Sequence, residues 1–209
     1  MVDNFNVIKE HMMFRNERSF YFVQILKRKK ENPEMKSYSR PIESFYIFSK
    51  EDLERYKQYI IDKCEKNRAR AYIKMNCLDA ESVMLEQIAT ITRAIRDNDW
   101  KAMSKTLNSA CGICGKQNGN EKLYLVDLDD IQVDSNEMKN MVNYIDSLQP
   151  LKFDENNNLI SKVKMAIPTK HGCHLLVTGF DKQTFKQNYN NIDVHDDGIT
   201  LLYFPQCCI

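Results

Sequence analysis

The second half of the chain carries a succession of periodic segments that restricts the folds it can form. Segments with the alternation and β-branched content of strands are interleaved with segments of helical spacing. In chain order we expect a strand at 122–129, a helix at 135–148, strands at 161–169 and 173–180, a helix at 181–189 and a strand at 198–204. This β-α-β-β-α-β order is the ferredoxin-like arrangement, so we predict an α/β protein of the α+β type with that core.

The same order brings distant parts of the sequence together. In such a sheet the first and third strands are central, adjacent and antiparallel, and the fourth strand flanks the first. The end of the first strand therefore lies beside the starts of the third and fourth strands. These places hold Asp127 with Asp129, then His174, and then the segment 191–199 with Asp193. We expect these acidic and imidazole groups to converge on one edge of the sheet.

The end of the first strand, in LYLVDLDDIQ (123–132), presents a pair of acids. Asp127 and Asp129 lie two residues apart, which places both side chains on the same face of a strand. Two carboxylates so close repel each other unless a cation, a water or a proton lies between them. Carboxylate oxygens suit Mg²⁺ or Mn²⁺, and a pair of such ions supports in-line phosphoryl transfer. The alternative is an ordinary acidic strand end that caps the next helix.

Three motifs between residues 120 and 205 together resemble the archaeo-eukaryotic primase, or primase-polymerase, superfamily. YLVDLDD (124–130) resembles the acidic pair of that family, PTKHGCHLLV (168–177) its histidine hairpin, and NIDVHDDGITLLYFP (191–205) its later lone acid. Gly172 and His174 match the hairpin motif. Asp193 best matches the lone acid, and Asp197 is the competing candidate.

The resemblance implies an RRM-like catalytic core and a metal-dependent nucleotidyltransferase, like a small stand-alone primase-polymerase of a phage. Nucleoside triphosphates and nucleic acid would be its partners, and Mg or Mn its cofactor. It implies metal ligation and catalysis by Asp127, Asp129 and Asp193, and binding of the triphosphate by His174, Lys170 and Thr169.

Two departures from the family pattern leave other functions open. Relatives commonly have an arginine in the last strand, where this chain has Tyr203, and the serine of the hairpin motif is replaced, with Thr169 the nearest hydroxyl. One alternative is a non-catalytic nucleotide- or nucleic-acid-binding protein with a degenerate primase-like pocket. Another is a metal-dependent phosphodiesterase that uses water as the nucleophile.

For the first half, residues 1–115, we predict a small α/β elaboration that packs on the core formed by residues 116–209. The glycine-rich stretch 109–122 is the expected boundary between the two within one compact unit. Basic stretches at 27–30 and 66–74 could follow a nucleic-acid backbone, since arginines interleaved with aromatics bind single strands. The alternative is a solvated basic face.

Composition excludes several classes of protein. The 30 basic and 29 acidic residues nearly cancel, so no global field indicates nucleic acid. No apolar run is long enough to cross a bilayer, and the charged start is unlike a signal peptide, so we expect no membrane partner and a cytoplasmic location, the host cytoplasm if phage-encoded. The sequence does not settle the oligomeric state.

Two further patterns are read as structural. Cys111 and Cys114 form a Cys-x-x-Cys, but a structural zinc needs four ligands and no second pair is present, so the zinc signal is weak. Apolar residues at helical spacing in the first half are expected in the core: Met84, Ile88, Ile91 and Ile95.

Overall fold

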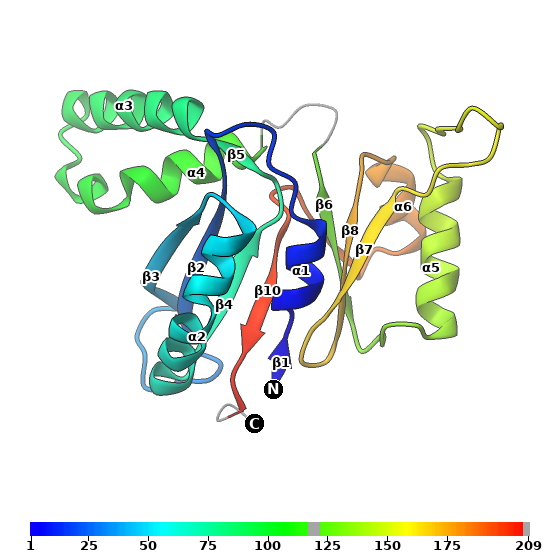
Figure 1. The fold of residues 1–209 in the computed structure, drawn as a ribbon, viewed down its shortest axis with the longest axis horizontal. Helices are drawn as coiled ribbons and strands as arrows, with labels where there is room; N and C mark the ends of the chain where they lie inside the picture. Colours follow the sequence, from blue (N-terminus) through cyan, green and yellow to red (C-terminus); the bar gives the residue numbers. More distant parts are fainter. Residues whose placement is uncertain (117–121, 207–209) are drawn as a thin grey trace.

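The computed structural model describes residues 1–116 and 122–206 and contains two antiparallel sheets with their helices (Figure 1). The α+β class predicted from the sequence is therefore confirmed. In Figure 1 the larger sheet stands on the left and the smaller one on the right, with α1 (Phe5–His11) in front of the junction between them.

The larger sheet is formed mainly by the first half of the chain. Its strands follow the order β1-β10-β4-β2-β3, and β5 pairs with one end of β2. Their bounds are β1 Val2–Asp3, β2 Ser19–Arg28, β3 Ser39–Ile47, β4 Ala69–Lys74, β5 Leu78–Asp79 and β10 Ile199–Phe204. Because β1 pairs with β10, the first and last strands of the chain lie side by side.

One face of the larger sheet is covered by α1 and by α2 (Lys50–Asn67). The start of α2 is capped by Ser49, whose Oγ accepts a hydrogen bond from the backbone N–H of Asp52 at 3.0 Å. The helix ends at Arg68, whose φ of 47° is left-handed. Arg68 therefore caps α2 and does not belong to the strand that follows.

A helical hairpin projects from the body, formed by α3 (Ala80–Arg96), the 3₁₀ helix η1 (Trp100–Lys105) and α4 (Thr106–Lys116) (Figure 1). The predicted break at 109–122 is wrong over 109–116, which are helical; 117–121 lie outside the described residues. The two glycines of this segment cost about 1 kcal/mol each in a helix. That cost is offset by burial of the apolar face, which packs on β2 through Ala110, Cys111 and Cys114.

The expectation that the apolar stripe of α3 lies in the core is also wrong. Met84 and Ile88 are each 62% exposed, Ile95 is 56% exposed and Ile91 is 40% exposed. Only Val83 of this helix is fully buried. The side of α3 that contacts α4 is its polar and small-residue side, so the stripe faces outward.

The smaller sheet is formed by the second half of the chain, in the order β7-β8-β6-β9. Its strands are β6 Tyr124–Asp129, β7 Val163–Pro168, β8 Gly172–Val177 and β9 Asp193–His195, and its helices are α5 Asn136–Ser147 and α6 Lys182–Asn188. The predicted antiparallel pairing of the first and third strands is confirmed, with Asp127 opposite His174.

The position of the last predicted strand is wrong. The fourth strand of the smaller sheet is the short β9, whereas β10 crosses to the larger sheet and pairs with β4 and β1. Leu201 to Phe204 are all buried, so this segment needs neighbours on both sides and on both faces. A position between β1 and β4 supplies them.

Each sheet thus has helices on one face and a partly open opposite face. In the smaller sheet, α5 and α6 cover the face of Val126, Leu175 and Val177. On its other face, Leu125 and Leu176 join the core around α1, while the polar positions beyond them stay open. Since side chains alternate along strands, these open positions and those of β2 and β4 face a common space.

Candidate active site

A cavity of about 520 Å³ lies where the open faces of the two sheets meet. Both halves of the chain contribute to it, together with the turn that joins β7 to β8. Its lining residues are Arg28, Lys30, Tyr38, Arg70, Tyr72, Leu125, Asp127, Asp129, Thr169, Lys170, His171, His174, His195, Asp197, Ile199 and Leu201. Five of the six predicted site residues are among them, and Asp193 is the exception.

The acidic wall of the cavity comes from β6. Asp127 and Asp129 line it from the same face of the strand, as the sequence predicts. Gly172 allows β8 to start close beside them, because a Cβ atom there would lie 1.9 Å from the carbonyl oxygen of Leu128. Any larger residue would push β8 and its turn away from the acids.

His174 links the acidic wall to the neighbouring sheet. Its Nε2 lies 3.4 Å from Asp127 Oδ1, and its Nδ1 lies 2.9 Å from the hydroxyl of the buried Thr200 on β10. A carboxylate only accepts hydrogen bonds, so a neutral imidazole carries its proton on Nε2 and accepts from Thr200 at Nδ1. The arrangement fixes both the ring orientation and the tautomer.

The charge of Asp127 is favoured by these neighbours. The hydrogen bond from His174 holds the pKa of Asp127 below its ordinary value; burial opposes this, and the charges of His174, His195 and Arg28 add to the lowering. Arg28 belongs to the first half of the chain, so the two halves are electrostatically coupled at this carboxylate.

The turn between β7 and β8 forms one rim. Thr169 closes it, since its hydroxyl accepts a hydrogen bond from the backbone N–H of Gly172 at 3.1 Å. Lys170 Nζ lies 5.3 Å from the ring centre of Phe204, a cation–π distance, and its side chain lines the cavity. The turn thus holds an ammonium group near the guanidinium of Arg70, whose Cζ lies 4.7 Å from the centre of the same ring.

The third predicted acid stands apart from the large cavity. Asp193 is opposite Asp127 in the β6–β9 pairing, but its side chain is 76% exposed and lies 3.8 Å from Lys186 Nζ. It lines a smaller cavity of about 130 Å³ together with Asp127 and Asp129. Asp197 lines the large cavity instead. The choice between Asp193 and Asp197 therefore stays open.

The opposite wall is cationic and aromatic, and it comes mainly from the two basic stretches, 27–30 and 66–74, that the sequence indicated as candidates for following a nucleic-acid backbone. Arg28 donates to the hydroxyl of Tyr72 at 3.0 Å and to that of Tyr38 at 2.6 Å. Arg70 is on the same face of β4 as Tyr72 and is paired with Glu31 in a largely buried ion pair. The two-residue alternation from Arg70 to Tyr72 was the usable signal.

Two residues near the end of the chain are placed by the structure. His195 is the last residue of β9 and lines the large cavity. Tyr203, at the position where the primase motif that the sequence resembles has arginine, points into the core, where its hydroxyl donates to Glu65 Oε1 at 2.7 Å. The cationic groups of this cavity come from β2, β4 and the β7–β8 turn.

The acid pair could hold a divalent cation only with help from other ligands. Among residues 1–116 and 122–206, no three His, Cys, Asp or Glu side chains are grouped so that they could hold a metal ion alone. Mg²⁺, however, is usually bound by one or two carboxylates, with waters and substrate phosphates completing its shell. Asp127 and Asp129 therefore fit an ion that arrives with a triphosphate.

The Cys-x-x-Cys pair lies away from this cavity. Cys111 and Cys114 are buried under the helical hairpin against Phe20 and Phe22. Burial raises the pKa of the Cys111 thiol to about 11, which disfavours the thiolate that a zinc ligand needs. Within the described part of the chain, the pair belongs to the apolar packing of α4.

Comparison of the chain with family models, curated proteins and solved structures gave no match. None of the helices in the described residues is both long enough and apolar enough to cross a membrane.

Proposed function

We propose that this protein is a metal-dependent nucleotidyltransferase, similar to the primase-polymerases, that uses nucleoside triphosphates to extend or prime nucleic acid. One observation carries the proposal: the acids of β6 and the cations of β2, β4 and the β7–β8 turn line one cavity. Its volume of about 520 Å³ is in the range of small-molecule sites. The strand order of the smaller sheet also supports an RRM-like core.

In this proposal the chain acts mainly by positioning charge, which is the principal task in phosphoryl transfer. Asp127 and Asp129 hold the divalent cation, which bridges and neutralises phosphate oxygens when bound. Arg28 and Lys170 bind the phosphates from the other sides of the cavity. His174 keeps Asp127 ionised and oriented, and presents a donor beside it.

Nucleic acid has a place on the same side of the molecule. Tyr38 is 72% exposed and lies under the guanidinium of Arg28, with Cζ 5.2 Å from the ring centre. An exposed aromatic ring next to a basic strand end offers a stacking surface for a base. A template or primer strand that stacks there would enter the cavity from the edge formed by Tyr38 and Lys30.

A non-catalytic nucleotide-binding protein is the second candidate, and a specific observation favours it. Asp193 is 76% exposed and lies 3.8 Å from Lys186, so it meets the acid pair only in the smaller cavity and does not line the large one. A cavity with two acids and several cations could bind a triphosphate with its cation and not turn it over.

Template-primed incorporation of labelled nucleotides in the presence of Mn²⁺ separates the candidates. Wild-type protein should incorporate nucleotide, and the Asp127→Asn variant should not. Asp130→Asn is the matched control: Asp130 neighbours the pair but lies outside the cavity lining, and asparagine tolerates its φ of 62°.

Other results would redirect the proposal. Incorporation that survives Asp127→Asn would exclude the assigned ligands. Triphosphate binding without incorporation would favour the binding protein, and release of nucleotides from a labelled strand would favour a phosphodiesterase.

A further inference from the structure

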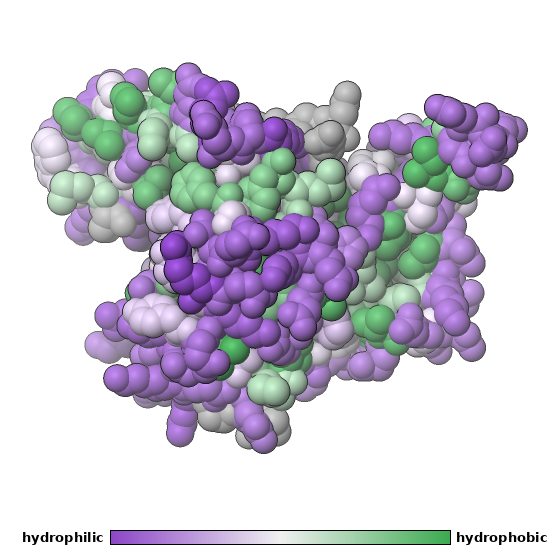
Figure 2. All heavy atoms as spheres, in the orientation of Figure 1, coloured by the Kyte–Doolittle hydropathy of each residue, from purple (hydrophilic) through white to green (hydrophobic). Residues whose placement is uncertain are grey.

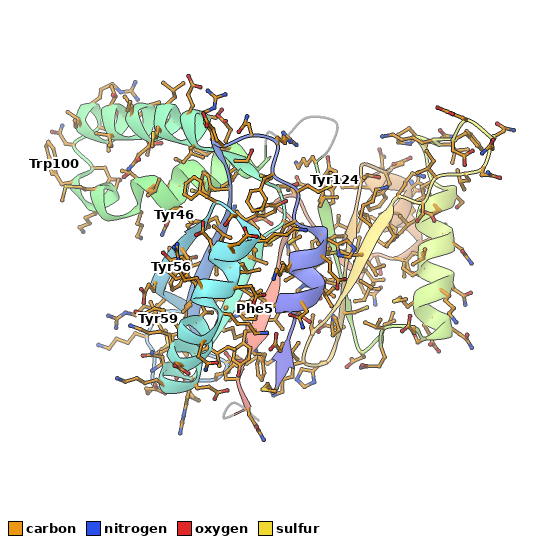
Figure 3. All side chains as sticks on the ribbon, viewed as in Figure 1. Phe5, Tyr46, Tyr56, Tyr59, Trp100 and Tyr124 are labelled. Carbon is orange, nitrogen blue, oxygen red and sulfur yellow. The ribbon has the colours of Figure 1, made fainter. Side chains whose placement is uncertain are left out.

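The projecting hairpin exposes a group of large apolar side chains that the nucleotide site does not use. Met84, Leu85 and Ile88 are each 62% exposed, and Ile91 and Ile95 extend the same stripe along α3. Figure 2 shows hydrophobic residues gathered on this arm, and Figure 3 shows Trp100 directed outward at its tip.

The orientation of α3 is the reverse of an ordinary surface helix. Gln87, Thr90 and Ala94 are half-buried on the side toward η1 and α4, and Gln87 Nε2 donates to Thr106 Oγ1 at 3.3 Å. A surface helix normally buries its apolar stripe and exposes such residues. Within the described chain, α3 therefore contacts its neighbours mainly through its polar and small residues. Its apolar stripe is available to contact another molecule.

The exposed area matches what a specific interface requires. The five side chains of the stripe expose roughly 500 Å² per chain, so two stripes in contact would bury about 1,000 Å² in total, the lower bound for a specific interface. Trp100 and Met103, at 66% and 79% exposure, lie at the hairpin tip. With them the exposed area approaches the roughly 800 Å² per partner of a standard interface.

The spacing of the stripe identifies a second copy of this chain as the partner. Met84, Ile88, Ile91 and Ile95 are separated by four, three and four residues, which is the spacing of a coiled-coil seam. That spacing reads the same from both ends. Two copies of α3 placed antiparallel about a twofold axis can therefore set Met84 against Ile95 and Ile88 against Ile91, each pair occurring twice.

The residues beside the seam fit the same register. They are uncharged: Leu85 and Thr92 lie on one side of the seam, and Gln87 and Ala94 lie on the other, toward α4. In an antiparallel pair each side meets the same side of the partner, so no like charges face each other there.

The charges of α3 argue against a lipid or nucleic-acid partner. Glu86 pairs with Arg93, and Glu81 and Arg96 pair with Arg18 and Asp97. Two acids and two bases give the helix no net charge, whereas surfaces that bind anionic lipid or phosphate carry an excess of Lys and Arg.

We propose that the protein forms a symmetric dimer through antiparallel pairing of two α3 helices. The proposal is independent of the nucleotide site, which faces the space between the sheets. In sedimentation equilibrium of the full chain over about 1–100 μM, the average mass should rise with protein concentration and reach twice the mass of the chain.

Paired charge substitutions test the register as well as the association. Met84→Lys with Ile95→Lys places like charges together in the proposed register and should raise the dimer dissociation constant by at least about 100-fold. Met84→Glu with Ile95→Lys places opposite charges together and should leave the protein dimeric. All these positions are exposed in the single chain, so the far-ultraviolet circular dichroism spectra should be unchanged. Leu159→Lys, at another exposed apolar site, is the control.

A wild-type protein that stays monomeric throughout this range would overturn the proposal. A dimer that persists in the double lysine variant would also overturn it. Loss of the dimer in the Glu–Lys variant would contradict the antiparallel register, because it indicates a parallel pairing. Flotation of a monomeric protein with neutral vesicles would replace the proposal with a membrane surface.

Discussion

The two walls of the cavity differ in both chemistry and construction. The smaller sheet contributes two carboxylates from one strand, and these are partly or fully exposed. The larger sheet contributes guanidinium and phenol groups from β2, from β4 and from the segment just before β3, and these are hydrogen-bonded to one another or paired with Glu31. Acids alone repel a triphosphate, and cations alone bind any polyanion. In our proposal, the two walls of one cavity together select an anion that carries its own divalent cation.

Because of this difference in construction, the two walls should contribute differently to the stability of the fold. The acids hold little of the fold, because their contacts are few and near solvent. The cations hold part of it, because Arg70 is 13% exposed and its partner Glu31 is 5% exposed. Substitutions on the two walls should therefore have different signatures.

The largest expected effect is on the acidic wall. We expect Asp127→Asn to lower the rate of nucleotide incorporation by about 10²–10³-fold, the usual cost of losing one charge that stabilises a transition state. The unfolding midpoint should change little. Steady-state incorporation and thermal unfolding of the same sample check this. Loss of both in proportion would show that the acidic wall is structural.

The next largest effect is on stability at the cationic wall. Arg70→Met leaves Glu31 buried without its ion-pair partner and should cost about 3–5 kcal/mol of unfolding free energy. The double variant with Glu31→Leu removes both charges and should recover most of that loss. Urea unfolding measures both. Equal destabilisation of the single and double variants would contradict this interpretation of the pair.

A smaller effect is expected at the half-buried Arg28 of the same wall. Arg28→Ala should weaken binding of a nucleoside triphosphate by roughly 10-fold, the value of one charged hydrogen bond, while Arg28→Lys should lose less. Isothermal titration in Mg²⁺ tests both. Unchanged affinity in the alanine variant would confine triphosphate binding to the β7–β8 turn.

The coupling between the walls can be followed by pH. The pKa of Asp127 is lowered in the folded protein, so its carboxylate stabilises the fold above the ordinary value of 3.8, and this contribution is lost as the pH falls through the folded-state pKa. His174→Gln removes the largest cause, so the pKa of Asp127 should rise toward 3.8. Carboxyl NMR titration measures the shift, and an unchanged midpoint would contradict the assigned hydrogen bond.

The smallest expected effect is at Thr200, which acts only through His174. Thr200→Val keeps the shape and removes the hydroxyl at Nδ1, so the pKa of Asp127 should rise by less than in His174→Gln. Incorporation should fall only a few-fold, in keeping with the loss of one neutral hydrogen bond. A loss as large as that of Asp127→Asn would mean that Thr200 contacts the substrate itself.

Local pattern predicted much of the fold and of the acidic wall. β6 and α5 lie within two residues of their predicted bounds, and Asp127, Asp129 and His174 meet because antiparallel pairing of neighbouring strands follows from their order. The predictions that were wrong concern segments whose position depends on residues far away in the sequence. The sheet that β10 joins is determined by its pairing with β4, which lies about 130 positions earlier in the chain. The periodicity of β10 itself carries no information about this partner.

The cationic wall and α3 show the same limit in two ways. Arg28 and Arg70 join the acids through the packing of two sheets, which local sequence does not encode. The stripe of α3 was correctly recognised as an apolar helical face, but periodicity cannot tell whether such a face is covered by its own chain or by another.

Binding of Mn²⁺ with a nucleoside triphosphate tests the central claim most directly, since water-proton relaxation reports whether the Mn²⁺–nucleotide complex is held on the slowly tumbling protein. The account predicts a relaxation enhancement with wild-type protein that is lost in the Asp127→Asn, Asp129→Asn double variant and retained in Asp130→Asn. Equal enhancement by wild type and the double variant would contradict it.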